Sequence, residues 1–244
     1  LVLAKNMQGY QNIVKLTSFG YLEGFYYKPR VDKELLREYN EGIIALSACV
    51  HGEVQYKTLH KGYERGKKIA LEYADIFPNR FYLEVQNHEL DDEDKWRELA
   101  KKMSAETGLP RVATNDSHYA KQEHWEAHDA HLCIGMAKDM DDPNRIRYDP
   151  PRYWIRTQEE MEELFPDDPE VLENTLEIAG QCNLEFEFDE YHLPKFPIPE
   201  DAGTDDPDEY LENLTWEGIE QRYDEITDKI KARVEHELGV IKDM

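Results

Sequence analysis

Two side chains with metal-binding chemistry stand two residues apart near the middle of the chain. Asp116 and His118 occur in the segment ATNDSHY (113–119), directly after an apolar stretch that is typical of a β-strand. Side chains alternate along an extended backbone, so a carboxylate and an imidazole at this spacing project to the same side. Both groups are ligands for zinc and related ions. The pair predicts part of a metal site, although Asp116 is also suited to cap a helix that follows.

A third candidate ligand, Cys49, ends the apolar run IIALSAC (43–49). A thiolate added to an aspartate and a histidine gives a plausible partial site for a zinc-like ion. Three ligands are too few for a multinuclear centre. The alternative is that Cys49 is a small buried residue that packs as an apolar side chain.

His51 and His88 lie close to the same predicted strand ends, where they could be metal ligands or loop residues, and we interpret both as loop residues. Three further histidines share one helix face at the spacing i, i+4 and i+7, with two carboxylates nearby. This group lacks the HExxH order of zinc proteases. We interpret that helix as one that packs against the domain. The group consists of His124, His128 and His131 with Glu126 and Asp129.

Other catalytic and nucleotide-binding patterns are missing from the sequence. It contains no GxxxxGK[ST] or GxGxxG loop for phosphates and no GxSxG turn for a nucleophilic serine. Nucleotide binding and nucleophilic catalysis by those routes are therefore unsupported.

An alternation of strands and helices is needed to position the candidate ligands. The chain opens with an apolar strand-like piece and a helix, and then strand and helix patterns follow in turn. Such alternation predicts an α/β fold with a parallel sheet or barrel, in which the polar residues after each strand share one rim. Strands are expected at 43–49, 80–86 and 109–119, and helices at 32–42, 63–77 and 91–108.

After about residue 120 helices dominate. Helices are expected over 122–137 and over 157–182, the latter divided by Pro166 and Pro169. A segment dense in proline and aspartate then predicts a linker. The predicted organisation is a first domain over 1–195, a linker over 196–208 and a helical segment over 209–244.

Composition limits the class of protein. An apolar content of 40% is enough for a core, but no apolar run approaches the roughly 20 residues of a membrane helix, and no export signal is visible. Three widely spaced cysteines are typical of reduced thiols in a cytoplasmic protein. The net charge of −24 opposes broad attraction to a polyanion, and we interpret it as a solvated acidic surface, such as that of a salt-adapted organism.

Seven segments resemble, in order, stretches of the alpha subunits of bacterial DNA polymerase III, the replicative C-family polymerases. The resemblance spans nearly the whole chain, and seven collinear segments are far more specific than any single motif. The segments are GYLEGFYYKPRVDKELL (20–36), EGIIALSACVHGEV (41–54), RFYLEVQNH (80–88), LPRVATNDSHY (109–119), EAHDAHLCI (126–134), ENTLEIAGQCNLEF (173–186) and YHLPKFPIP (191–199).

The resemblance implies the second part of a PHP-type (β/α) barrel followed by the helical start of a polymerase module. In that family the barrel holds up to three metal ions, zinc or manganese, and the matching ligand positions here are Cys49, Asp116 and His118. An early HxH motif, a later histidine and a glutamate of the family site have no counterpart, so we expect the domain to begin upstream of Leu1. The aspartates of the polymerase site, which take magnesium, are expected beyond Met244, leaving no catalytic residue in this chain.

The implied function is a part in DNA replication as a DNA-directed DNA polymerase, a nucleotidyltransferase. The PHP domain would act as a metal-dependent 3′–5′ exonuclease or as a scaffold, and we expect this chain alone to be inactive. The implied partners are primer-template DNA, deoxynucleotides, a sliding clamp and a proofreading subunit in the cytoplasm, with no membrane. The alternative is a free-standing PHP phosphoesterase, which would have no reason to continue into a linker and further helices.

Overall fold

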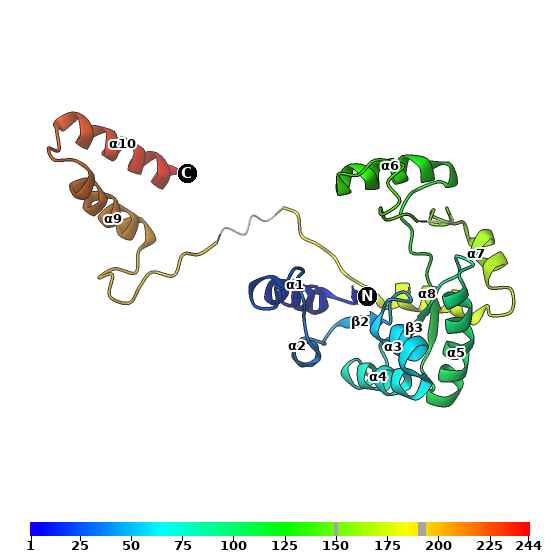
Figure 1. Ribbon diagram of the computed structural model, residues 1–244. Helices are drawn as coiled ribbons and strands as arrows, with labels where there is room; N and C mark the ends of the chain where they lie inside the picture. The colour runs from blue at the N-terminus through cyan, green and yellow to red at the C-terminus, as the bar shows by residue number, and fades with distance from the viewer. Residues whose placement is uncertain (149–150, 190–193) are drawn as a thin grey trace. The chain divides into compact units, whose positions relative to one another are not determined.

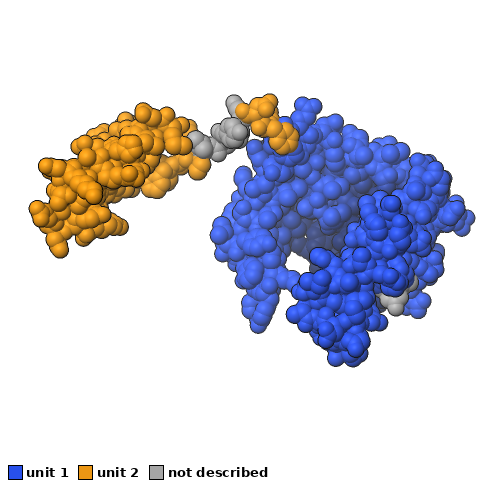
Figure 2. Space-filling view, turned by 90° about the horizontal axis from the view of Figure 1, so that it is seen from above, with its two compact units in different colours: residues 1–186 blue, residues 187–244 orange. Residues whose placement is uncertain are grey.

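The computed structural model describes residues 1–148, 151–189 and 194–244 (Figure 1). Contacts divide the chain into two compact units, residues 1–186 and 187–244 (Figure 2). The first unit contains β1 (Val2–Ala4), α1 (Met7–Leu22), α2 (Lys33–Glu38), β2 (Ile43–Leu46), α3 (Glu53–Lys61), α4 (Tyr63–Ile76), β3 (Phe81–Val85), α5 (Asp91–Thr107), β4 (Arg111–Ala113), the 3₁₀ turn η1 (Gln122–His124), α6 (Trp125–Met136), α7 (Gln158–Leu164) and α8 (Glu170–Gln181). The second contains α9 (Pro207–Arg222) and α10 (Asp228–Asp243).

A four-stranded sheet in the order β1-β2-β3-β4 organises the first unit. β2 is parallel to β3 and β3 is parallel to β4, and helices connect these three strands, as the alternating pattern predicts. β1 is antiparallel to β2, so the sheet is mixed and the fully parallel expectation is wrong for its first strand. The connection through α1 and α2 returns the chain beside β1, and the α/β class is confirmed.

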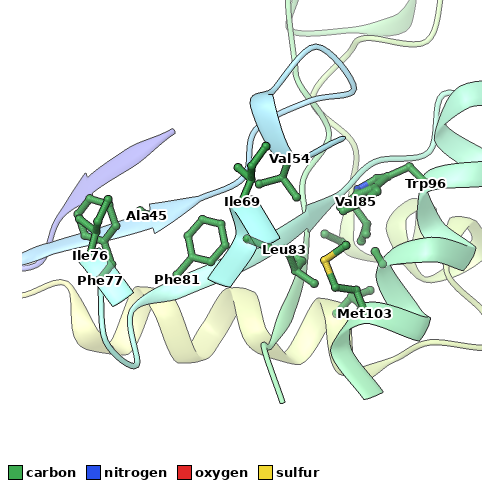
Figure 3. Close-up of a cluster of buried hydrophobic side chains, with 14 of the residues drawn as sticks. Ala45, Val54, Ile69, Ile76, Phe77, Phe81, Leu83, Val85, Trp96 and Met103 are labelled. Carbon is green, nitrogen blue, oxygen red and sulfur yellow. The ribbon is translucent and has the colours of Figure 1, made fainter. Parts of the chain in front are cut away.

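The larger core lies between one face of the sheet and helices α3, α4 and α5 (Figure 3). Alternate residues of the strands point into it, as the two-residue period of a strand requires. Its largest fully buried side chain is Trp96 of α5, whose Nε1 donates to the Glu84 carbonyl oxygen at 2.7 Å. Strand residues in this cluster include Ile43, Ala45, Phe81, Leu83, Val85 and Ala113.

The opposite face of the sheet is also buried, by a smaller cluster that includes Ile178 of α8. The alternation of apolar and polar residues in RFYLEVQ predicts the strand β3, which is confirmed, and all five residues of β3 are buried. Parallel strands covered on both faces are typical of α/β proteins. Tyr82 and Glu84 therefore lie inside the protein, and Glu84 needs hydrogen-bond partners there.

The helices after β4 follow the predicted breaks. α7 ends before Pro166 and α8 begins after Pro169, as predicted. Asp168 between them accepts a bidentate ion pair from the buried Arg111 of β4, which fixes α8 against the sheet. The pairing shows that the acidic PDDPE segment is not entirely a solvated surface.

The second unit begins at residue 187, earlier than the predicted boundary at 195, and the predicted domain limits stay predictions. Asp206 caps α9, where its carboxylate accepts the backbone N–H groups of Asp208 and Glu209. Part of the motif YHLPKFPIP, residues 191–193, lies outside the described residues. None of the helices in the described residues combines the length and apolar character that a membrane span requires.

Gly9 of α1 should not tolerate a side chain. A Cβ built there would lie 1.8 Å from the carbonyl oxygen of Gly42, so backbone would have to move. We expect Gly9→Ala to lower the free energy of unfolding by about 1–3 kcal/mol, the usual cost of overpacking. Gly135→Ala in α6 is the control, because nothing lies within 4 Å of its Cβ and alanine favours a helix by about 0.5–1 kcal/mol. Urea unfolding measures both, and equal stability of the two variants would contradict the close approach.

Candidate functional site

The carboxyl ends of β2, β3 and β4 lie at the same edge of the sheet, because the three strands are parallel. Cys49 follows β2, His88 follows β3, and Asp116 and His118 follow β4. The strand directions therefore agree with the predicted shared rim, where parallel α/β folds place their sites. We call this edge the rim.

Asp116 and His118 do not lie on extended backbone. β4 ends at Ala113, and Asp116 has a φ of 44°, in the left-handed region. The strand-alternation argument for this pair is therefore wrong, because the turn at Asp116 redirects the chain. His118 Nδ1 donates to the Asp116 carbonyl oxygen at 2.6 Å, which leaves its Nε2 as the nitrogen free to bind a metal.

Aromatic rings surround His118. Its ring centroid lies 4.2 Å from that of Tyr148, 5.4 Å from Tyr153 and 5.8 Å from His128 of α6. Burial raises the pKa of Tyr153 to about 12, with the charges of Glu93 and Asp116 acting in the same direction. Burial also lowers the pKa of His128, helped by the neighbouring His118. The shifted pKa values of Tyr153 and His128 both favour the neutral form of the side chain.

Cys49 lies at the other end of the rim. It is half-buried and its thiol is free. The backbone nitrogen of Leu1 donates to the Leu46 carbonyl oxygen at 3.0 Å, so residue 1 lies beside the end of β2.

The donor types of Cys49, Asp116 and His118 suit zinc or manganese, but the described residues include no group of three or more His, Cys, Asp or Glu side chains placed to hold a metal ion. The three candidates share an edge without forming such a group. The residues described do not fit a complete metal site by themselves, and we derive no hydrolytic step from them. The ligand role of the three stays a prediction.

A buried polar network that the sequence analysis missed lies behind the rim. Glu84 Oε1 accepts from Thr114 Oγ1 at 2.5 Å and from Gln86 Nε2 at 3.1 Å. Gln55 Nε2 donates to Ser47 Oγ at 2.7 Å. Within the described part of the chain, Glu84 Oε2 and Gln55 Oε1 are buried without a hydrogen-bond partner. Unpartnered buried oxygens are costly, so this network has unused capacity to bind a cation or a donor.

His88 lies in the loop between β3 and α5, as predicted, but it is buried, with only 1% of it exposed. Its Nδ1 lies 2.7 Å from Glu93 Oε1 and its Nε2 lies 2.9 Å from the Asn115 carbonyl oxygen. The ring also stacks on Tyr153 with centroids 4.2 Å apart. Both nitrogens are occupied, so His88 joins the ends of β3 and β4 to α5. No local pattern indicates the pairing of His88 with Glu93, because Glu93 is one of four consecutive acidic residues in the first turn of α5.

The predicted histidine helix differs from expectation. His124 belongs to the 3₁₀ turn η1, before α6 begins at Trp125, so the three histidines do not share one α-helix. His51, interpreted as a loop residue, is exposed and lies in a turn. α6 buries only Cys133 among its described residues, so it packs against the domain less than we expected. His128 provides its link to the rim, through the ring contact with His118.

Comparison with known proteins first defines the class of the domain. Residues 1–88 match the PHP domain family. Cys49 lies within the matched residues, and Asp116 and His118 lie beyond them. The α/β fold with three parallel strands agrees with part of a PHP-type barrel.

The full chain extends this assignment. It is 45% identical to DNA polymerase III subunit alpha of Borreliella burgdorferi over an alignment of 245 residues. The alignment covers 100% of this chain and 21% of the relative. The Treponema pallidum subunit is 40% identical with the same coverage, and the Thermus aquaticus subunit is 38% identical over 98% of this chain and 20% of its own length. The chain is therefore similar to part of bacterial DNA polymerase III alpha subunits, and the predicted resemblance is confirmed. It spans about a fifth of the length of these relatives.

Proposed function

We propose that the chain is part of a replicative DNA-directed DNA polymerase. The observation that carries the proposal is identity of 35–45% to DNA polymerase III alpha subunits over nearly all of the chain, second unit included. A free-standing PHP phosphoesterase is disfavoured, because the homology continues through the linker and the helices α9 and α10.

Within that protein the PHP region would be a scaffold whose rim becomes a metal-dependent 3′–5′ exonuclease when further ligands from the longer polypeptide complete it. The shared edge of Cys49, Asp116 and His118 and the unpartnered Glu84 Oε2 support the exonuclease. Zinc or manganese would bind at the rim, where it would activate water and stabilise a leaving oxygen. Magnesium would serve the polymerase site in another part of the polypeptide.

The proposed partners are those of a replicative polymerase. Primer-template DNA and deoxynucleotides would be its substrates in the cytoplasm, and a sliding clamp and a proofreading subunit would assemble with it. The relatives' names support DNA and replication partners in general terms only.

Primer extension by the longer polypeptide that contains this chain tests the proposal. We expect extension of a labelled primer with magnesium and deoxynucleotides, and no hydrolysis of a small phosphate monoester. Rapid hydrolysis of the monoester with no extension would instead support the free-standing phosphoesterase.

The isolated chain should bind zinc or manganese weakly. A partial set of ligands leaves an ion mostly hydrated, and metal affinity depends on a complete and correctly spaced set. Calorimetric titration of the chain, with Cys49→Ser as the matched variant, should show no stoichiometric plateau for either protein. Tight binding at a ratio of one that Cys49→Ser removes would show that the rim already holds enough ligands.

A further inference from the structure

The first 31 residues have the opposite charge from the rest of the protein. They contain four basic residues, Lys5, Lys15, Lys28 and Arg30, and one acidic residue, Glu23, a net charge of +3, whereas the whole chain carries −24. α1 has no acidic residue. Salt at 0.1 M screens charges that lie more than about 10 Å away. An anion close to this segment therefore interacts mainly with its positive charges and only weakly with the distant acidic residues.

The segment that joins α1 to α2 (Figure 1) carries several large aromatic side chains that are exposed. We call residues 21–31, which are the last two residues of α1 and most of the loop after them, the aromatic loop. Tyr27 is 84% exposed, and Tyr21, Phe25 and Tyr26 are 57–61% exposed. Large rings are normally buried at least in part, and a contiguous exposed group of them marks an interaction site.

The backbone of the aromatic loop is folded tightly around Tyr27. Tyr27 has a φ of 62°, which is strained for a bulky side chain, and the Tyr26 N–H donates across it to the Lys28 carbonyl oxygen at 3.1 Å. A Cβ on Gly24 would lie 1.9 Å from the Arg30 carbonyl oxygen, so the two ends of the loop are in close contact. Strained residues held in this way are common in ligand clamps. The loop is therefore a preformed turn that presents Tyr27 to solvent.

One cation of the loop, Arg30, lies beside an aromatic ring, and neither Arg30 nor Lys28 is paired with an acid in the described residues. The Arg30 guanidinium lies 4.9 Å from the centroid of the Tyr26 ring. Neither Lys28 nor Arg30 forms an ion pair with a carboxylate in the described residues, although many lysines and arginines elsewhere in the chain do. Rings and free cations side by side can stack on bases and neutralise phosphates at once.

We propose that the aromatic loop binds single-stranded nucleic acid. Bases would stack on Tyr27 and Tyr26, and Lys28 and Arg30 would contact the backbone phosphates. Exposed aromatic residues and arginine also occur at protein interfaces, but the reversal of charge and the unpaired lysine favour a polyanion. The choice of DNA over RNA rests on the proposed function in replication.

Fluorescence anisotropy of the 244-residue chain with a labelled oligothymidylate of about 15 nucleotides tests the inference. We expect binding at low salt that weakens as salt rises. Tyr27→Ala should weaken it about fivefold or more, because one stacked base contributes at least about a factor of five. Lys28→Ala should weaken it too and reduce the slope of log affinity against log salt by about 0.7.

Tyr56→Ala is the matched control, because Tyr56 is 41% exposed with Lys57 beside its ring but lies on α3. Circular dichroism would verify that all variants fold. No binding at low salt, or equal binding by the Tyr27 and Tyr56 variants, would overturn the inference. Protection of the aromatic loop from hydrogen exchange in the longer polypeptide without DNA would also overturn the inference, because another part of the protein would then cover the loop. Primer extension that persists under any of these results would leave the proposed function standing.

Discussion

Trp96→Ala should lower the free energy of unfolding of the chain by about 3–5 kcal/mol, the usual range for a buried tryptophan. Trp96 is 1% exposed and is the largest fully buried side chain. Its removal leaves a cavity between α5 and β3 and also deprives the buried Glu84 carbonyl oxygen of its donor at 2.7 Å. The loss is a large part of the roughly 5–15 kcal/mol that stabilises a typical domain.

Urea unfolding followed by circular dichroism measures this effect. Trp125→Ala is the matched control, because Trp125 begins α6 and is 40% exposed, so we expect a change below about 1 kcal/mol. A Trp96 variant as stable as the Trp125 variant would show that α5 does not pack on the sheet as described.

Asp116→Ala or His118→Ala in the longer polypeptide should abolish any 3′–5′ exonuclease and leave primer extension mostly in place. Catalysis by positioned metal ions needs every ligand at once, so the loss of one should cost most of the activity. The polymerase site is proposed to lie in another part of the protein. A labelled primer-template resolved on a gel reports both activities in one reaction.

His131→Ala is the matched control for the histidine variant, because His131 is exposed on α6. It should keep both activities. An exonuclease that survives Asp116→Ala would remove Asp116 from the site. Loss of both activities together, with a lower unfolding midpoint, would show that the rim residues serve the barrel's stability and not a separate site.

Most of the first unit could be predicted from local patterns. Gly42, with a φ of 69°, ends the segment after α2, and the run that follows it becomes β2. Pro166 and Pro169 separate α7 from α8 because proline disrupts a helix interior. The antiparallel direction of β1 was not predictable, because strand direction depends on how the chain returns between elements and not on side-chain period.

The candidate site was predictable at the level of the strand ends and no further. Cys49 and Asp116 follow parallel strands, as the pattern indicates. The left-handed turn at Asp116 and the inward rotation of Glu93 toward His88 depend on tertiary contacts that no local spacing encodes. Glu84 was missed because burial of β3 on both faces requires α8, which is distant in the sequence.

The most direct test of the central claim compares the isolated chain with the longer polypeptide on a labelled primer-template. We predict that the longer polypeptide extends the primer and that the 244-residue chain, with zinc, manganese or magnesium, neither extends it nor shortens its 3′ end. Extension or degradation of the primer by the isolated chain, or failure of the longer polypeptide to extend it, would contradict the account.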